Sequence, residues 1–179
     1  RLSKASIGIG ACLGDEKCKA SALKCMEEYK QHITNALRWY EEAAQKNNGS
    51  KSIIKGKGYV IINAEDNVMP TIIGTLASMI AYSNTVPKGT FILSMARAQQ
   101  GYTKASLRIV GRENRNNSDN GQGNINLMEL ITEIANRGNG QAGGHHEAAG
   151  AFIKTEKEKE FIEAAKTILT NKRLEESIA

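Results

Sequence analysis

Hydrophobic positions in the first quarter of the chain recur in steps of three and four residues, which is the period of an α-helix. The stripe consists of Ala22, Met26, Tyr29, Ile33, Ala36, Tyr40 and Ala43. Asp15 is expected to cap the start of this helix, and the Asn-Asn-Gly-Ser run at 47–50 ends it near Lys46. The pattern predicts one long helix whose apolar stripe packs on the core or on a neighbouring domain.

The residues before this helix, 1–14, are apolar and rich in glycine. Gly8, Gly10 and Gly14 do not have the spacing of a dinucleotide-binding fingerprint, and no strand precedes a helix here. We therefore expect a connection punctuated by glycines, and not a nucleotide site.

After residue 50 the hydrophobic positions form short runs with β-branched residues, separated by helical segments. Strands are predicted at 58–64, 89–96, 105–111 and 149–154. Helices are predicted at 69–83, at 125–138 and from 155 onward, where Thr155 and Glu158 have the spacing of a capping box. The first two strands and their helix form a parallel βαβ unit, and the third strand should pair with the second as a hairpin. The sequence thus predicts an α/β fold, a mixed sheet of four to five strands with flanking helices and a long N-terminal connector helix.

Composition narrows the class of protein. Hydrophobic residues make up 40% of the 179 residues, no apolar run is long enough to cross a bilayer, and we expect a soluble, cytoplasmic protein without a membrane partner. Three cysteines in no metal or redox spacing argue against a disulfide framework. A net charge of +5 favours an anionic partner without identifying it.

Two adjacent histidines, His145 and His146, follow a pair of glycines and raise the question of a metal site. Such a site needs three or more convergent ligands. Adjacent side chains of an extended chain point in opposite directions. The aspartates, which are Asp15, Asp66 and Asp119, do not cluster with histidine in the sequence. We therefore expect this chain to bind no metal.

The same glycines suit a phosphate better, because glycine leaves backbone N–H groups open and allows turns that aim several of them at one anion. A histidine beside them adds a hydrogen-bond donor. Ser106 and Arg108 are two residues apart on a predicted strand, so they share a face, and an arginine fork matches a phosphate. The alternative for Arg108 is an ordinary solvated strand residue.

These residues carry a resemblance to a known family. The run "GGHHEAAG" at 143–150 is similar to the Gly-Gly-His-x-x-Ala-Ala-Gly signature of the DHH-associated domain in the DHH phosphoesterase superfamily. Four further segments resemble the same family. Its Ser-x-Arg strand is matched by "SLR" at 106–108, and the start of its next helix by "NL" at 126–127. Its Gly-x-x-Ala-Ser helix is matched by "IIGTLAS" at 72–78, and its connector by "RLSKASIGIGACLGD" at 1–15. The connector resembles most the archaeal RecJ-like single-strand exonucleases. Ala142 stands where many members have a further glycine.

The resemblance implies a division into residues 1–50, the glycine-rich connector and long helix, and residues 51–179, the DHH-associated substrate-binding domain. In the family the His of Gly-Gly-His and the Arg of Ser-x-Arg contact substrate phosphate. These roles fall on His145 and Arg108, with Ser106 and the amides of Gly143 and Gly144 beside them. Further strand contacts are expected from other basic residues, namely Arg97, Arg112 and Arg115.

What the chain lacks is equally informative about the expected activity. Family members hold manganese or magnesium with an N-terminal domain that carries an Asp-His-His run, and this sequence contains no such run. Because the chain starts at Arg1, we expect a fragment of a metal-dependent exonuclease that has no catalytic residues and is inactive alone. The expected partners are single-stranded DNA or RNA and the protein's own catalytic domain.

Alternative functions remain open at this stage. The domain could be a non-catalytic scaffold in a replication assembly, where archaeal relatives are linked to the GINS complex. It could be the substrate-binding half of a phosphodiesterase for short RNA or cyclic dinucleotides. It could also be an RNA-editing accessory, since alanyl-transfer-RNA synthetases carry a related domain.

Overall fold

A computed structural model describes residues 4–45, 51–83, 85–111 and 125–178, with side chains up to residue 172. Its centre is one six-stranded sheet in the order β1-β2-β3-β4-β6-β5. The strands are β1 (Ile53–Gly56), β2 (Tyr59–Asn63), β3 (Phe91–Arg97), β4 (Tyr102–Ile109), β5 (Gln141–His145) and β6 (Ala148–Lys154). Strands β2 and β3 are parallel, and the other neighbours are antiparallel. The predicted mixed α/β sheet is confirmed.

Two strands beyond the predicted ones complete the sheet. Strand β1 pairs with β2 as a hairpin whose turn contains Gly58 at φ +81°. Strand β5 contains the two glycines of the Gly-Gly-His run and pairs with β6, so the predicted glycine–histidine loop is in fact the edge strand of the sheet. Glycine has a low strand propensity, which is why the sequence alone predicts a loop here.

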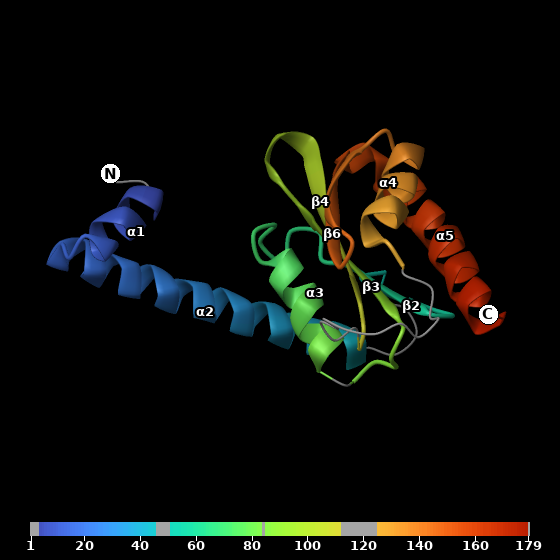
Figure 1. Cartoon of the computed structure of the whole chain (residues 1–179), viewed down its shortest axis with the longest axis horizontal. Coiled ribbons are helices and arrows are strands. Elements are labelled where there is room, and N and C mark those ends of the chain that lie inside the picture. Colours follow the sequence, from blue (N-terminus) through green and yellow to red (C-terminus); the bar gives the residue numbers. More distant parts are fainter. Residues whose placement is uncertain (1–3, 46–50, 84, 112–124, 179) are drawn as a thin grey trace.

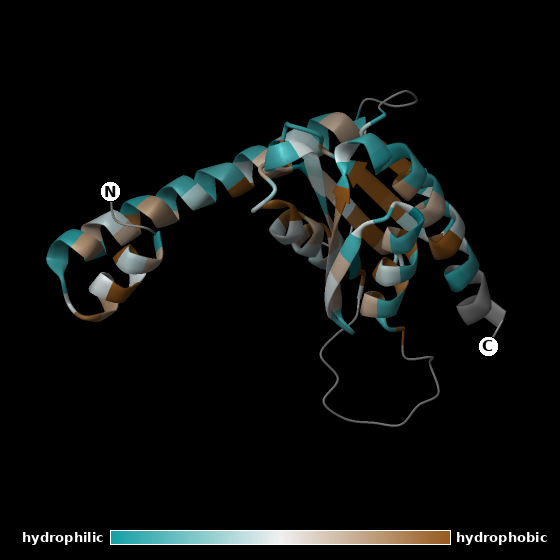
Figure 2. Cartoon of the chain, turned by 90° about the horizontal axis from the view of Figure 1, so that it is seen from above, coloured by the Kyte–Doolittle hydropathy of each residue, from teal (hydrophilic) through white to brown (hydrophobic). Residues whose placement is uncertain are grey.

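Helices cover both faces of the sheet (Figure 1). They are α1 (Lys4–Cys12), α2 (Glu16–Gln45), α3 (Ile73–Tyr82), α4 (Leu127–Arg137) and α5 (Glu158–Ile178). Helices α4 and α5 pack on one face through a core that includes Leu93, Leu107 and Phe161. Helix α3 and the second half of α2 pack on the other face, against Val60, Ile62 and Ile92. Hydrophobic residues accordingly concentrate between the sheet and its helices (Figure 2).

Helix α2 begins as predicted, because the Asp15 carboxylate accepts a hydrogen bond of 2.7 Å from the Cys18 amide. Its apolar stripe packs only in part. Ala36 is buried, whereas Met26 and Tyr29 are 57% and 44% exposed. The first half of α2 extends away from the sheet (Figure 1), and part of its stripe is left exposed there.

The glycine-rich start of the chain is helical, which corrects the expectation of a plain connection. Gly8 and Gly10 lie inside α1. A side chain at Gly10 would collide with the Cys18 Sγ atom, so this glycine allows α1 to pack closely against α2. The glycine therefore serves helix packing here instead of a turn. None of the described helices is both long and apolar enough to cross a membrane.

Candidate phosphate-binding site

The sheet has a face that α3 covers only in part. Helix α3 packs on β3 and β4, and the α3-side residues of β5 and β6 are not part of the core beneath it. We call the α3-side surface of β4, β6 and β5 the open face. Several of its residues, including Gly143, His145 and Phe152, are exposed.

Strand pairing places the predicted site residues on this open face. Ser106 pairs with Gly150, which pairs with Gly143, so these three residues form one row across β4, β6 and β5. Paired residues of neighbouring strands point to the same side of a sheet. Ser106 itself is only 5% exposed, because α3 passes close to it at Gly74, whereas the other two members of the row are glycines and leave bare backbone.

The next row brings the arginine and the first histidine together. His145 pairs with Ala148, and Arg108 follows the residue that pairs with Ala149. Arg108 and His145 therefore lie on the open face two strands apart, at a Cα separation of about 10 Å from the spacing of strands. Ala148 of β6 lies between the two residues.

The guanidinium of Arg108 is half-buried between α3 and the sheet. Its Nε donates to the Ser78 hydroxyl at 3.0 Å, and its Nη1 donates to the carbonyl oxygens of Leu107 at 2.8 Å and Ala149 at 3.4 Å. No ion pair within the described part of the chain joins Arg108 to a carboxylate. All its recorded partners are thus neutral oxygens.

Burial has a direct electrostatic consequence for this group. It lowers the pKa of the Arg108 guanidinium because it disfavours the charged form, while a weaker electrostatic interaction with Tyr82 raises that pKa. An arginine still remains protonated at neutral pH. Within the described residues, the site therefore holds a half-buried cation that no carboxylate neutralises.

Ser78 is a site residue that the residue patterns alone did not single out. Its hydroxyl donates to the Gly74 carbonyl at 3.0 Å and accepts from Arg108, so it fixes the direction of the guanidinium. A side chain at Gly74 would lie 3.3 Å from the Ser106 Oγ and 3.6 Å from the Arg108 Nη2, so glycine allows α3 to approach β4 closely. The Gly-x-x-Ala-Ser segment at 74–78 contains both residues and could have indicated this contact.

The three glycines of the β5–β6 hairpin differ in what the fold demands of them. Gly143 and Gly150 belong to the open face, whereas Gly144 pairs with Ala149 of the core and so belongs to the opposite face. Gly144 has a φ of +136°, and a Cβ there would lie 2.5 Å from the Ala148 carbonyl oxygen. A Cβ at Gly150 would lie 2.7 Å from the Ala105 carbonyl oxygen. A Cβ at Gly143 would meet nothing within 4 Å. Gly144 and Gly150 are therefore needed by the backbone, whereas Gly143 leaves open space on the surface.

The hairpin that carries the two histidines is anchored to α4. The Leu127 amide donates to the His146 carbonyl oxygen at 3.0 Å, and the Asn126 side chain caps α4 by accepting from the Met128 amide at 3.0 Å. The predicted start of this helix at 126–127 is confirmed. His146 lies in the turn after β5, so its backbone holds the hairpin in place.

Arg97, a predicted strand contact, lies away from this group. It sits at the far end of β3, on the face where its alternate neighbours Leu93 and Met95 contact α4 and α5. Its guanidinium meets three carboxylates, Asp66 at 2.9 Å, Glu65 at 3.5 Å and Glu158 at 3.6 Å. The hydrogen bond to Asp66 is the largest cause of the raised pKa of Arg97. Arg112 and Arg115 lie outside the described residues.

The capping box predicted at the start of the last helix is not formed. The Glu158 carboxylate instead accepts a short hydrogen bond from the Thr103 hydroxyl, and Thr103 also lies 3.2 Å from the Thr155 hydroxyl. Both residues therefore bind β4 and not the helix terminus. No cluster of three or more histidine, cysteine, aspartate or glutamate side chains able to hold a metal occurs among the described residues.

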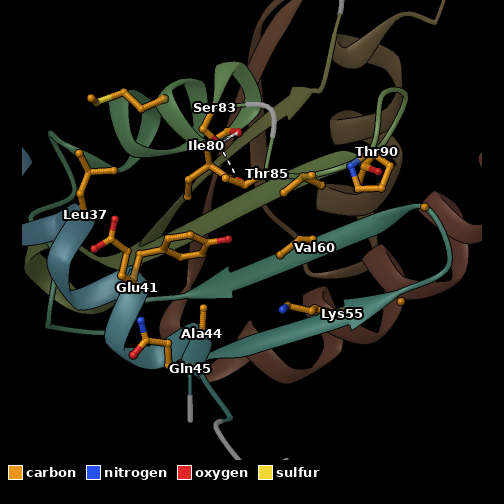
Figure 3. A pocket seen from close by; sticks show the side chains of 16 residues that line it. Leu37, Glu41, Ala44, Gln45, Lys55, Val60, Ile80, Ser83, Thr85 and Thr90 are labelled. Atoms are coloured by element: carbon orange, nitrogen blue, oxygen red, sulfur yellow. Dashed lines mark hydrogen bonds between the residues drawn. The ribbon is translucent and has the colours of Figure 1, made fainter. Parts of the chain in front are cut away.

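A cavity of about 690 Å³ lies elsewhere on the molecule. Its walls come from the end of α2, the β1–β2 hairpin, the end of α3 and the segment before β3 (Figure 3). Its ionisable lining consists of Glu41, Lys55 and Tyr40, and burial raises the pKa of Tyr40. None of the predicted site residues lines this cavity, so the open face is a separate feature.

Comparison with known proteins identifies the family. The DHHA1 domain matches residues 56–171, which is more than half of the chain. The chain therefore belongs to the DHHA1 domain family. No curated protein has significant sequence similarity to it.

The fold is similar to RecJ from Thermus thermophilus. The RecJ structure in complex with Mg²⁺ gives a TM-score of 0.57 at 15% identity over 88% of this chain and 21% of the RecJ chain. The structure with Mn²⁺ gives 0.55 at 16% identity over 88% and 20%. This chain thus spans about a fifth of the length of these RecJ structures. The C-Ala domain of Aquifex aeolicus alanyl-tRNA synthetase is also similar, with a TM-score of 0.49 at 18% identity over 66% of this chain and 97% of that domain.

Proposed function

We propose that the chain is the C-terminal nucleic-acid-binding domain of a RecJ-like, single-strand-specific exonuclease. The open face holds backbone phosphates of single-stranded DNA or RNA, and a separate catalytic domain with manganese or magnesium ions cleaves the strand. Membership of the DHHA1 domain family and the RecJ-like fold support this proposal. The expected setting is DNA replication and repair in the cytoplasm.

Arg108 is the observation that carries the proposal. A half-buried cation whose recorded hydrogen-bond acceptors are all neutral is costly to keep. A phosphate would supply the counter-charge together with charge-assisted hydrogen bonds to the guanidinium fork. Ser78 holds that fork beside the open face before any ligand arrives.

The surroundings of Arg108 supply further donors for the same anion. Strand β5 is the edge of the sheet, so alternate N–H groups near Gly143 and Gly144 point away from β6. Open amides of this kind bind anions. His145 and Ser106 are on the same face and complete the proposed group.

Replacing Arg108 by glutamine removes the positive charge of the proposed site. Arg108→Gln should weaken binding of a fluorescent single-stranded oligonucleotide about 10-fold or more, because one charge-assisted contact contributes about 1.5–3 kcal/mol. Fluorescence anisotropy at two salt concentrations measures this effect. Wild-type affinity should fall as salt rises, because phosphate contacts release counterions.

The matched control is Arg38→Gln, which removes the same charge from an exposed position on α2. It should change affinity far less than Arg108→Gln does. Equal losses in the two variants would show that only net charge matters. Affinity that does not depend on salt would contradict a phosphate site altogether.

A further inference from the structure

Phe152 is an aromatic side chain in an unusual place. It lies in the middle of β6, pairs with Lys104 of β4 and Gln141 of β5, and is 47% exposed. Its neighbours in the strand, Ala151 and Ile153, are buried in the core on the other face. The ring of Phe152 therefore stands on the open face.

The charge around this ring is one-sided. Strands β4, β5 and β6 have no aspartate or glutamate at their open-face positions, whereas Lys104 and Arg108 are cations there. Lys154 adds a third cation, although Glu156 lies 4.0 Å from its Nζ. Charge complementarity thus favours an anionic occupant with a flat apolar part.

The distance between Phe152 and the proposed phosphate site fits a single nucleotide. Phe152 is two residues from Gly150 on the same face, which is about 7 Å along a strand. A base can span that distance from its own phosphate. A phosphate held at the row of Ser106, Gly150 and Gly143 would place the attached base over the ring.

We propose that Phe152 is a stacking platform for a base of the bound single strand, and that Lys104 contacts the adjoining backbone. This inference rests on the proposed function of the open face. Base–aromatic stacking tolerates any sequence because every base has a π-face. The platform would therefore give the domain affinity for single strands, whose bases are free to stack, without sequence readout.

An acidic peptide is the main rival occupant. Its carboxylates would pair with the cations, but the peptide would gain little from an exposed aromatic ring. It would also not require the bare backbone that Gly143 and Gly150 leave on the open face. A nucleotide uses the ring, the cations and the bare backbone together. The geometry therefore favours a nucleic acid.

The test compares two strands of equal length and charge, a single-stranded oligonucleotide and its fully abasic analogue. Phe152→Leu keeps an apolar side chain and removes the ring. It should weaken binding of the base-containing strand at least about fivefold, the lower end of the effect of one stacked base, and leave binding of the abasic strand unchanged. Tyr29→Leu, an exposed aromatic of 44% on α2, is the matched control and should change neither.

A second readout reports stacking directly. Trp39 is the only tryptophan, so a Trp39→Phe, Phe152→Trp chain has its single tryptophan on the open face, and this residue can be excited selectively at wavelengths that the tyrosines do not absorb. Its emission should be quenched by the base-containing strand and not by the abasic strand. Thermal melting of each variant confirms that the fold is retained.

Three outcomes would overturn the inference. The first is that Phe152→Leu weakens binding of the base-containing and the abasic strand equally. The second is that it weakens binding of neither strand. The third is that polyglutamate competes for the domain as strongly as the oligonucleotide does. If Arg108→Gln still weakens binding of both strands in these cases, the results support the phosphate site and contradict only the stacking role of Phe152. If the wild-type chain binds neither strand, the proposed function fails with it.

Discussion

At the scale of single residues, the two arginines of the central strands show how position decides role. Arg108 meets neutral oxygens on the open face, whereas Arg97 meets Asp66, Glu65 and Glu158 on the opposite one. Both residues are basic and both lie in strands, so composition does not separate them. Strand parity and pairing do, and pairing is a property of the folded sheet.

We expect Arg97 to matter for stability and not for binding. Arg97→Gln leaves the Glu158 carboxylate, which is 9% exposed, without its cation. Removing one partner of a buried pair is costly, but Arg97 is 35% exposed, so solvent screening reduces the loss to about 1–2 kcal/mol. Urea unfolding measures the free energy of unfolding.

Lys157→Gln is the control for this variant, because it breaks an exposed pair with Glu160 at 2.9 Å. It should leave the free energy of unfolding nearly unchanged. Oligonucleotide affinity should be unaltered in Arg97→Gln. A clear loss of affinity with intact stability would mean that Arg97 contacts the strand after all.

Among the elements of the fold, the β5–β6 hairpin contains glycines that its backbone requires and one glycine that leaves the surface open. Gly144 adopts a backbone conformation that other residues avoid, and Gly150 allows β6 to approach β4. Gly143 has neither constraint. An unconstrained glycine beside Arg108 and His145 is what a site that binds through backbone amides requires.

Substituting alanine at these glycines separates folding from binding. Gly143→Ala should fold with normal stability and bind oligonucleotide about tenfold more weakly, because its methyl group occupies the space of a ligand at the amides. Gly144→Ala should destabilise the hairpin by about 1–3 kcal/mol, because φ is +136°. Thermal melting and anisotropy measure the two effects.

Gly8→Ala in α1 is the control, since a Cβ there also meets nothing within 4 Å. It should leave binding unchanged. If Gly143→Ala binds like the wild-type chain, the amides near it do not contact the ligand, and the hairpin serves the fold alone.

The sequence predicted elements well where local patterns match the final packing. The parallel pair β2–β3, the cap at Asp15 and the start of α4 at 126–127 are all present. It missed β5 because glycines mask an edge strand, and it missed α1 because its glycines serve helix packing. The spacing of Thr155 and Glu158 predicts a helix cap, but both side chains contact Thr103 of β4 instead. Residue spacing along the chain cannot reveal such a contact.

At the scale of the whole molecule, the site depends on what the fold leaves uncovered. Helices α4 and α5 bury one side of the sheet. On the other side α3 packs on β3 and β4 and does not cover β6 and β5 (Figure 1). The candidate residues come from β4, β5 and α3, and none of these elements forms the site alone. Motif order predicted most members of this group, but the contact from Ser78 to Arg108 required the position of α3.

Binding of single-strand phosphates by the open face around Arg108 can be followed residue by residue. The isotope-labelled chain is titrated with a single-stranded oligonucleotide and observed by ¹H–¹⁵N NMR. We expect the largest shift changes at the Arg108 side-chain Nε–H and at the amides of Gly143, Gly144 and His145. Changes confined to the face covered by α4 and α5, or to the cavity beside α2, would contradict this expectation.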